Sequence, residues 1–472
     1  MHSLRHSSVL FPSSDDRART EDLLADALRT LDARIELGPV APTLDMDSFR
    51  TELAAFDFAA PQALDNLLPW VIDRLEHGIV QIAHPRYFGL FNPAPTFPAQ
   101  CADRIVAAFN PQLASSTTAP AACEVEAHVI RAVAARAGLP PGSGGHFTTG
   151  GAEANATALI CALTAAHPDF ARHGARCFSG RPVFYVSNEA HLAWIKIALQ
   201  TGLGRDAARL VPTDGAGRMS APALCNAIEA NRAAGCVPIM VVATAGTTAA
   251  GMIDPLAPCA EIARRAGAWY HVDAAWGGAL IASDRHRAVL AGIELADSVT
   301  IDAHKWFATT MGCGMFLTRR PAVLSDAFQV ATGYMPSNVA GVDPYVTTIQ
   351  WSRRFLGLRL FLSLAAAGWA GYAAHTERAI ALIATLRDAV RARGWTVANE
   401  SGLAVLCIEP PAGSADPATI VRRVLAGGTA WVSMAVFEGR KTIRACVTHG
   451  ATSREDVERL VAALEAARED RR

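Results

Sequence analysis

The hydrophobic pattern changes character at about residue 100 of the chain. Beyond that point, short apolar runs predict strands at residues 183–187, 237–244, 268–272, 298–301 and 314–317. Apolar residues at helical spacing lie between most of these runs and predict helices at residues 152–166, 191–201, 221–233 and 257–266. Strands this apolar, separated by helices, are typical of an α/β fold in which a mostly parallel sheet is covered by helices on both faces.

The flanking parts of the chain have a different organisation. Helical spacing predicts helices at residues 21–35 and 64–78, and the Pro- and aromatic-rich stretch 84–99 predicts an irregular loop that lines something. A long helical pattern at 351–393 is followed by strands at 404–408 and 442–447 and a helix at 453–468, where Ser453 and Asp456 resemble a capping box. We therefore predict three parts: an N-terminal helical segment (1–95), a large domain (96–350) and a smaller α+β C-terminal domain (351–472).

The composition narrows the class of protein. With 472 residues, of which 51% are hydrophobic and 18% charged, the chain is long enough for two or three lobes. A formal net charge of −1 gives no electrostatic reason to expect a nucleic-acid or membrane partner, and no run of eighteen apolar residues exists. The ten cysteines form no C-x-x-C pair or Cys/His cluster, so we expect no metal site, no disulfide framework and a cytoplasmic location. We also expect no signal peptide, because the first twenty residues lack an apolar core.

Two side chains indicate a specific cofactor. Asp273, in "HVDAAWGG", follows one predicted strand, and Lys305, in "DAHKW", follows the next after a short turn. Ligands of open parallel sheets bind beyond the carboxyl ends of the strands, which is where both groups stand. A lysine amine can condense with the aldehyde of pyridoxal 5'-phosphate, and a carboxylate can keep its pyridine nitrogen protonated so that the ring accepts electrons. Taken alone, Asp273 would more often be a turn or cap residue, and Lys305 a solvated charge.

Three further segments agree with this interpretation. Gly150 and Gly151 precede a predicted helix, where glycine lets the backbone approach a phosphate and the helix N-terminus offers unpaired N–H groups. His191 begins another predicted helix, where an imidazole can stack on a flat ring and carry a proton. The threonines of "ATAGTTAAG" (243–251) follow a third strand and can bond a cofactor. In isolation, a strand–helix turn, a helix cap and a strand terminator explain these residues at least as well.

The combined motifs match a known family. In this order and spacing, "TGGAEAN", "SNEAH", "ATAGTT", "HVDAAWGG" and "DAHKW" resemble the group II pyridoxal-dependent decarboxylases, over a region from about residue 75 to the C-terminus. That family includes aromatic-amino-acid, glutamate, cysteine-sulfinate and 2,4-diaminobutyrate decarboxylases. The resemblance implies fold type I, with a large cofactor domain and a small C-terminal domain. It also implies a homodimer with the active site at the subunit interface, in which the N-terminal segment packs on the partner subunit.

The resemblance implies roles for individual residues. Lys305 matches the Schiff-base lysine, and Asp273 matches the partner of the pyridine nitrogen. His191 matches the histidine that stacks on the ring, and Ala275 the residue on the opposite face. The remaining matches are cofactor-binding positions and one supporting acid: Gly150, Gly151, Ala152, Thr248, Asp302 and His304, with Asp254 as the acid.

Tyr334 distinguishes between reactions. It lies in "AFQVATGYMPSNVAG" (327–341), which matches the family's mobile loop, where a tyrosine is required for decarboxylation. The implied reaction converts an L-amino acid to an amine and CO2 through an external aldimine and a quinonoid, with Tyr334 returning a proton to the α-carbon, directly or through His191. An aldehyde-forming decarboxylase/oxidase, a carbon–carbon lyase or an aminotransferase would also keep Lys305 and Asp273 and is the alternative. A non-catalytic scaffold fits the intact lysine less well.

The substrate side follows from the same resemblance. The stretch "HPRYFGLFNPAP" matches the family's substrate loop and gives three contacts: Phe91, Asn92 and Pro93. The positions that add bulky apolar side chains from the partner subunit in aromatic-amino-acid decarboxylases are Gln112 and Ala114 here, which predicts a roomier and more polar pocket. Arg444, in "TIRACV", matches an arginine at the start of a C-terminal strand. It would hold a substrate carboxylate or form a structural ion pair.

Overall fold

The computed structural model describes residues 10–330 and 343–469. Its central sheet has seven strands in the spatial order β1 (Gly144–Thr148), β7 (Gly314–Thr318), β6 (Ser298–Asp302), β5 (Trp269–Asp273), β4 (Cys236–Thr244), β2 (Arg181–Ser187) and β3 (Ala208–Val211). Strand β7 runs antiparallel to both of its neighbours, and the other adjacent pairs are parallel. All five strands predicted from apolar runs are present, so the prediction of a mostly parallel sheet is confirmed.

Helices cover both faces of this sheet. On one face lie α8 (Gly151–Ala166), α9 (Phe170–His173), α10 (Ala193–Gln200) and α13 (Ala322–Phe328), and on the other α7 (Pro120–Arg136), α11 (Ala221–Ala233) and α12 (Leu256–Ala266). Successive side chains of a strand point to opposite faces. In β4, Met240 and Val242 therefore pack in the core beneath α8, whereas Val241 and Ala243 pack in the core beneath α12. Burial on both faces explains why these strands are almost entirely apolar.

The hydrophobic pattern missed two strands of this sheet. Strand β1 has the sequence GGHFT, and its glycines and His146 hide it from a search for apolar runs. Strand β3 pairs with β2 alone, and its Leu210 is 53% exposed. A strand at the edge of a sheet is not fully buried, so it lacks the continuous apolar run that marks a central strand.

The C-terminal part forms a second, antiparallel sheet of four strands, in the order β10 (Ser433–Phe437), β11 (Arg440–Cys446), β9 (Val405–Glu409) and β8 (Thr396–Val397). Helix α15 (Pro417–Ala426) packs on this sheet, and α16 (Arg454–Arg468) packs on α15. The capping box at the start of α16 is confirmed, because Ser453 Oγ accepts the N–H of Asp456 and the Asp456 carboxylate accepts the N–H of Ser453. The short strands β8 and β10 were not predicted.

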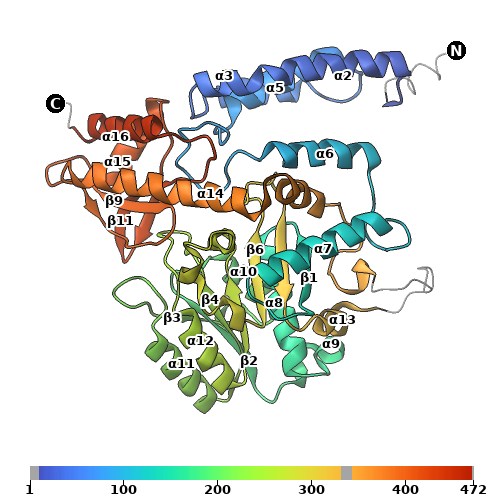
Figure 1. Ribbon diagram of the computed structural model, residues 1–472, viewed down its shortest axis with the longest axis vertical. Coiled ribbons are helices and arrows are strands. Elements are labelled where there is room, and N and C mark those ends of the chain that lie inside the picture. Colours follow the sequence, from blue (N-terminus) through green and yellow to red (C-terminus); the bar gives the residue numbers. More distant parts are fainter. Residues whose placement is uncertain (1–9, 331–342, 470–472) are drawn as a thin grey trace.

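Helix α14 (Gly357–Arg391) begins six residues later than the helix predicted at 351–393, and it is interrupted at Gly368, where φ is 62° and ψ is 178°. Its start is set by Glu126 of α7, whose Oε1 accepts the N–H groups of Leu356 (3.0 Å) and Gly357 (2.9 Å). Those N–H groups would otherwise bond within a preceding helical turn. A partner this distant in sequence is invisible to a periodicity argument. Figure 1 shows α14 running from beside α16 to beneath α6.

The N-terminal helices form a layer at one edge of the molecule (Figure 1): α2 (Ser14–Arg29), α3 (Leu31–Leu37), α4 (Met46–Ala54), α5 (Leu64–Gly78) and then α6 (Phe97–Phe109). The helix predicted at 64–78 is confirmed, whereas the one predicted at 21–35 is two helices that meet at Thr30. The irregular loop predicted at 84–99 is confirmed up to Thr96. None of the helices in the described ranges combines the length and apolar character that a membrane crossing requires.

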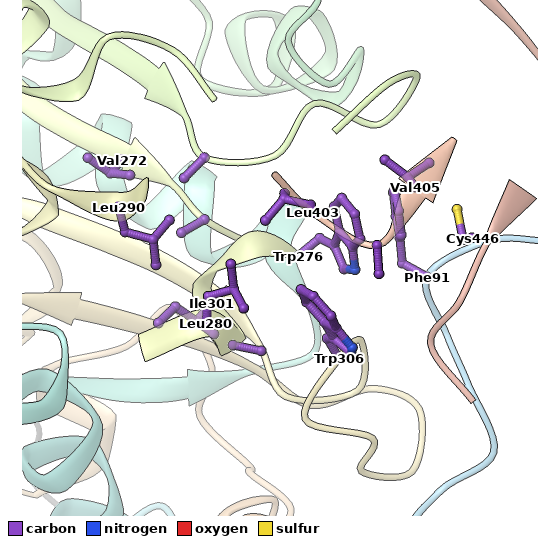
Figure 2. Packing of buried hydrophobic residues seen from close by; sticks show 14 of the residues in the cluster. Phe91, Val272, Trp276, Leu280, Leu290, Ile301, Trp306, Leu403, Val405 and Cys446 are labelled. Atoms are coloured by element: carbon purple, nitrogen blue, oxygen red, sulfur yellow. The ribbon is translucent and has the colours of Figure 1, made fainter. Parts of the chain in front are cut away.

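The largest core cluster joins the central sheet to the C-terminal part. Figure 2 shows Phe91 and Trp276 close to Leu403 of the C-terminal part, and the ring centroids of Phe91 and Trp276 are 4.0 Å apart. Next to Trp276, a Cβ atom at Gly277 would lie 2.2 Å from the carbonyl oxygen of Ala245, so only glycine fits there. This close approach holds the segment after β5 against the end of β4.

Candidate active site

The carboxyl ends of β4, β5 and β6 meet the N-terminus of α8 around a cavity of about 260 Å³. Larger hollows lie elsewhere on the surface, but this one collects most of the residues singled out in the sequence. Its lining includes the cofactor residues predicted from the sequence and one predicted substrate contact: Gly150, Gly151, Ala152, His191, Thr248, Asp273, Ala275, Asp302, His304 and Lys305, with Phe91 as the substrate contact. The fold thus brings together side chains that are spread over more than two hundred residues of sequence.

Asp273 ends β5 with 5% of its surface exposed. Its Oδ2 accepts a hydrogen bond from Nδ2 of Asn155 at 2.8 Å, and its Oδ1 accepts one from the backbone N–H of Ala275 at 3.2 Å. A carboxylate has about four acceptor positions, so both oxygens keep lone pairs for a ligand. A carboxylate held in this way can pair with a protonated ring nitrogen.

Lys305 lies three residues beyond β6, with 24% of its side chain exposed. Its Nζ is 3.0 Å from Oδ2 of Asp302, the last residue of β6. Nε2 of His304 lies 3.8 Å from the same oxygen, and Nδ1 of His304 lies 3.0 Å from the carbonyl oxygen of Cys313. Asp302 therefore orients the amine of Lys305 from inside the cavity.

The N-terminus of α8 closes one side of the cavity. Gly150 is the N-cap and Gly151 the first helical residue. A Cβ atom at Gly151 would lie 2.8 Å from Oδ2 of Asp302 and 3.4 Å from Cβ of Ala275, so the absence of a side chain keeps this space open. The first N–H groups of a helix have no partner within it and lie at the positive end of its dipole. This corner of the cavity suits a phosphate group.

His191 is exposed at the cavity and lies two residues before α10, so the helix predicted at 191–201 begins two residues later than expected. Its Nδ1 accepts the N–H of Ala193 at 3.1 Å and caps the first residue of the helix. Desolvation lowers the pKa of His191, while the nearby charge of Asp273 acts in the opposite direction. Thr248 is likewise exposed along the lining.

Three buried polar atoms of the lining residues have no hydrogen-bond partner in the part of the chain that the structure describes: Oγ1 of Thr244, Nε1 of Trp276 and Oδ1 of Asp302. Buried polar groups are ordinarily paired, so unpaired atoms on residues that line one cavity are what a site for a polar ligand is expected to contain. Around them stand an amine (Lys305), an anion (Asp273) and a helix N-terminus. The residues present therefore fit pyridoxal 5'-phosphate.

Phe91 separates the cavity from a buried arginine. Its ring packs against Trp276, and the guanidinium carbon of Arg444 lies 4.5 Å from the centroid of the same ring. Arg444 is 3% exposed, and its Nη1 donates to Oγ of Ser433 at 3.3 Å. Within the described ranges, Nε and Nη2 have no hydrogen-bond partner and Arg444 belongs to no ion pair. The structural ion pair considered for Arg444 is thus not found among these residues.

The remaining sequence-predicted residues are not part of the lining. Asn92 and Pro93 follow Phe91 but do not line the cavity. Gln112 is exposed, with its Oε1 accepting the N–H of Ala114 at 2.8 Å. Tyr334 lies outside the described residues.

Several lining residues were missed by sequence reasoning: Thr149, Asn155, Ala193, Gly246 and Trp276. Asn155 carried a usable signal, because it lies four residues after Gly151 and therefore shares its face of the helix. Thr244, one of the threonines expected to bond a cofactor or to end the strand, ends β4 just as Asp273 ends β5 and Asp302 ends β6.

Asp254 supports the end of β4 from outside the cavity. Its Oδ2 accepts the N–H of Thr244 and its Oδ1 the N–H of Met219, both at 2.7 Å. Burial raises the pKa of Asp254 to about 6, although the two hydrogen bonds act in the opposite direction. This acid therefore contacts backbone and does not line the cavity.

Comparisons with known proteins agree with this geometry. Residues 52–409 match the family model described as the pyridoxal-dependent decarboxylase conserved domain. The L-2,4-diaminobutyrate decarboxylase of Rhizobium meliloti (strain 1021) is 32% identical over 406 residues, which cover 84% of this chain and 80% of that protein. The cysteine sulfinic acid decarboxylase of Mus musculus is 33% identical over 339 residues, 70% of this chain and 68% of that protein.

Solved structures share the fold along nearly the whole chain. Mouse CSAD in its apo form superposes with a TM-score of 0.89 and 26% identity, covering 96% of this chain and 100% of that chain. Oryza sativa TDC with PLP and tryptamine has a TM-score of 0.90 at 24% identity and covers 96% and 98%, which supports the fold alone. The chain therefore belongs to the pyridoxal-dependent decarboxylases: it is an enzyme of fold type I that uses pyridoxal 5'-phosphate as its cofactor, as the sequence predicted.

Proposed function

We propose that this cavity removes the α-carboxyl group of an L-amino acid and releases CO2 and the corresponding amine. The observation that carries the proposal is the convergence of Lys305, Asp273 and the N-terminus of α8 on one cavity. When bound, pyridoxal 5'-phosphate supplies an electron-accepting ring for the electrons of the breaking carbon–carbon bond. Named amino acid decarboxylases among the relatives support the same reaction class.

Lys305 would hold the cofactor through its amine, which Asp302 orients at 3.0 Å. Asp273 would keep a proton on the ring nitrogen, because a buried anion next to that nitrogen favours its protonated form. The ring would lie between His191 and Ala275. The phosphate and the ring substituents would be held by the remaining residues predicted for the cofactor: Gly150, Gly151, Ala152, Thr248, Asp302 and His304.

A proton must reach the α-carbon to replace the carboxyl group that has left as CO2. We assign this step to Tyr334, directly or through His191, on the strength of the motif around it. His191 suits a relay because desolvation lowers its pKa and favours the neutral ring, which can both accept and donate a proton.

The substrate side chain would enter beside Phe91, Asn92 and Pro93. Arg444 would bind a carboxylate of the substrate, since its Nε and Nη2 have no partner among the described residues. A movement of Phe91, whose ring lies against the guanidinium, would open the way to those two nitrogens. The named relatives act on 2,4-diaminobutyrate and cysteine sulfinic acid, so small amino acids with a polar or charged end are the first candidates.

A homodimer would complete the site. Large apolar side chains are exposed on the N-terminal helices, among them Val71 and Leu75 on α5 and Phe97 (71% exposed) and Phe109 (81%) on α6. Exposed apolar area of this kind marks an interface, and a second copy is the occupant that we propose. Gln112, which is exposed outside the cavity, would then reach the neighbouring site. In sedimentation analysis Phe109→Asp should shift the protein toward a monomer, and an unchanged dimer would contradict this interface.

The division into a partner-binding segment (1–95), a cofactor domain (96–350) and a C-terminal domain (351–472) belongs to the same proposal. It is supported by the origin of the two sheets, because the seven-stranded sheet comes from residues 144–318 and the four-stranded sheet from residues 396–446. The cytoplasmic location stays a prediction from the scattered cysteines.

The test is a substrate screen with product analysis. Purified protein is loaded with cofactor and incubated with single amino acids, including 2,4-diaminobutyrate, cysteine sulfinate, aspartate, glutamate and the aromatic amino acids, while released CO2 and amine are measured. We expect equal amounts of both products from one small group of substrates, and neither from Lys305→Ala. An aldehyde with ammonia and peroxide, or transfer of the amino group, would favour the related fold type I enzymes. No product from any amino acid, by protein that binds the cofactor, would refute the proposal.

A further inference from the structure

The residues behind Asp273 form a chain of hydrogen bonds that the reaction described so far does not use. We infer that Asn155 and His271 are positioning residues, which hold the Asp273 carboxylate in the orientation that the ring nitrogen requires. The inference rests on the proposed role of Asp273 and extends it to two residues that lie within the motifs but were given no role from the sequence.

The side chains involved share one face of the sheet. Trp269, His271 and Asp273 are alternate residues of β5 and so point to the same side. Ser298 of the parallel neighbour β6 lies directly opposite His271. Helix α8 covers this face, and Asn155 lies on its second turn. Each of these five side chains is at most 5% exposed, although the core around them is apolar.

The contacts connect these side chains one after another. Nδ2 of Asn155 donates to Oδ2 of Asp273 at 2.8 Å, and Nε2 of His271 lies 3.1 Å from Oδ1 of Asn155. Nδ1 of His271 lies 2.8 Å from Oγ of Ser298, which also accepts from the indole Nε1 of Trp269 at 2.8 Å. The chain therefore runs without a gap from Trp269 to the Asp273 carboxylate.

The donors and acceptors fix a single direction for the chain. The ionised carboxylate of Asp273 can only accept, so Asn155 turns its NH2 group toward Asp273 and its Oδ1 toward Nε2 of His271. Nε2 of His271 must then donate to that oxygen, and a neutral imidazole with its hydrogen on Nε2 accepts at Nδ1. The hydroxyl of Ser298 therefore donates to Nδ1 of His271 while it accepts from the indole N–H of Trp269. Burial lowers the pKa of His271 to about 4, which agrees with a neutral ring.

This arrangement supplies Asp273 with a donor that carries no charge. A lysine or arginine at the position of Asn155 would neutralise the carboxylate and weaken its attraction for the ring nitrogen. The uncharged amide leaves the negative charge intact, and with the N–H of Ala275 on the other oxygen it prevents rotation of the carboxylate. Oγ1 of Thr300 lies 3.4 Å from Nε2 of His271 and is a weaker second acceptor for the same hydrogen.

The test compares two cofactors whose only difference is the atom that Asp273 would hold. Apoprotein is titrated with pyridoxal 5'-phosphate and with the analogue in which carbon replaces the ring nitrogen, and the ratio of the two dissociation constants is measured. In the wild-type protein this ratio measures the strength of the interaction between Asp273 and the ring nitrogen. In Asn155→Leu and His271→Leu we expect the preference for the natural cofactor to fall about 10-fold or more, as for the loss of a hydrogen bond to a charged group. His271→Gln can still donate to Asn155 and accept from Ser298, and it should restore most of the preference.

Thr157→Val is the matched control, because Thr157 is a buried polar residue of the same helix and bonds the backbone of Glu153 instead of the chain to Asp273. It should leave the ratio unchanged. A structural role for Asn155 and His271 would weaken both cofactors equally, and an unchanged ratio in both leucine variants would overturn the inference. If one leucine variant fails to fold, the other decides, together with His271→Gln. A wild-type protein that binds both cofactors equally would instead refute the proposed role of Asp273 itself.

Discussion

Replacing Arg444 with methionine should stabilise the protein and weaken substrate binding at the same time. Arg444 is 3% exposed, and its guanidinium contacts Oγ of Ser433 at 3.3 Å and the ring of Phe91 at 4.5 Å. Burying a charged group has a penalty of several kcal/mol, against which a cation–π contact contributes about 2 kcal/mol and one charged hydrogen bond about 1.5–3 kcal/mol. Methionine fills a similar volume without charge, so we expect the free energy of unfolding to rise by about 1–3 kcal/mol.

The same replacement should weaken substrate binding. If Nε and Nη2 of Arg444 bind a substrate carboxylate, removing them costs about 1.5–3 kcal/mol, which corresponds to roughly a 10–100-fold rise in KM. We expect a smaller change in kcat, because a contact made equally in the ground state and the transition state affects KM alone.

Urea unfolding of the cofactor-free protein measures the first effect, and initial rates of CO2 release measure the second. Arg440→Met is the matched control. Arg440 lies four residues earlier in the same strand, β11, is half exposed and pairs with Glu409 at 2.9 Å. Its replacement should therefore change the free energy of unfolding by at most about 1 kcal/mol and leave KM unchanged. A less stable Arg444→Met variant with an unchanged KM would show that Arg444 only packs against Phe91, and would refute the reasoning.

Three further predictions follow from the same structure. Tyr334→Phe should lower the amount of amine formed per CO2 released, because the tyrosine would supply the α-carbon proton; full amine yield by chromatography would count against that role. Glu126→Gln breaks a buried ion pair with Arg353 (2.9 Å) and should lower the free energy of unfolding by about 3–5 kcal/mol, with partial recovery when Arg353→Met is added; urea unfolding measures both. Asp254 has a folded pKa of about 6, above its ordinary value, so its stabilising contribution is present below about pH 4 and is lost as the pH rises through about 6. Relative to Asp254→Asn, the wild-type protein should therefore lose about 3 kcal/mol between about pH 4 and pH 7, and a constant difference in urea unfolding would contradict the assignment.

The sequence predicted the interior strands of the central sheet. Five strands lie inside the sheet and have the apolar runs that the search detects: β2, β4, β5, β6 and β7. Such a run is absent from β3, at the edge of the sheet, and from β1, which contains two glycines and a histidine. The start of α14 was misplaced for a different reason. It depends on the carboxylate of Glu126, which lies more than two hundred residues away in sequence, and local periodicity carries no information about such a partner.

The residues of the candidate site also fall into two groups: those that a local motif predicts and those that depend on contacts between distant parts of the sequence. Residues within local motifs, such as Lys305 and Asp273, line one cavity because each motif follows the carboxyl end of its own strand. Gln112 was expected at the substrate and lies outside the cavity of its own chain, which is consistent with a site that a second copy completes. Arg444 reaches the site through Phe91, a contact between an N-terminal loop and a C-terminal strand that only the folded chain creates.

The polar side chains of the apolar strands β5 and β6 form one group on the same face of the sheet. In β5 and β6, His271, Asp273, Ser298 and Asp302 all face α8, although the strands around them are apolar. Each buried polar group without a partner would cost free energy, so such residues persist only where they bond one another or a ligand. The inner members, His271 and Ser298, bond one another, and the outermost, Asp273 and Asp302, turn toward the cavity. An alternating polar line that ends at the carboxyl edge of a parallel sheet therefore identifies both the ligand-binding end of the strand and the residues that support it.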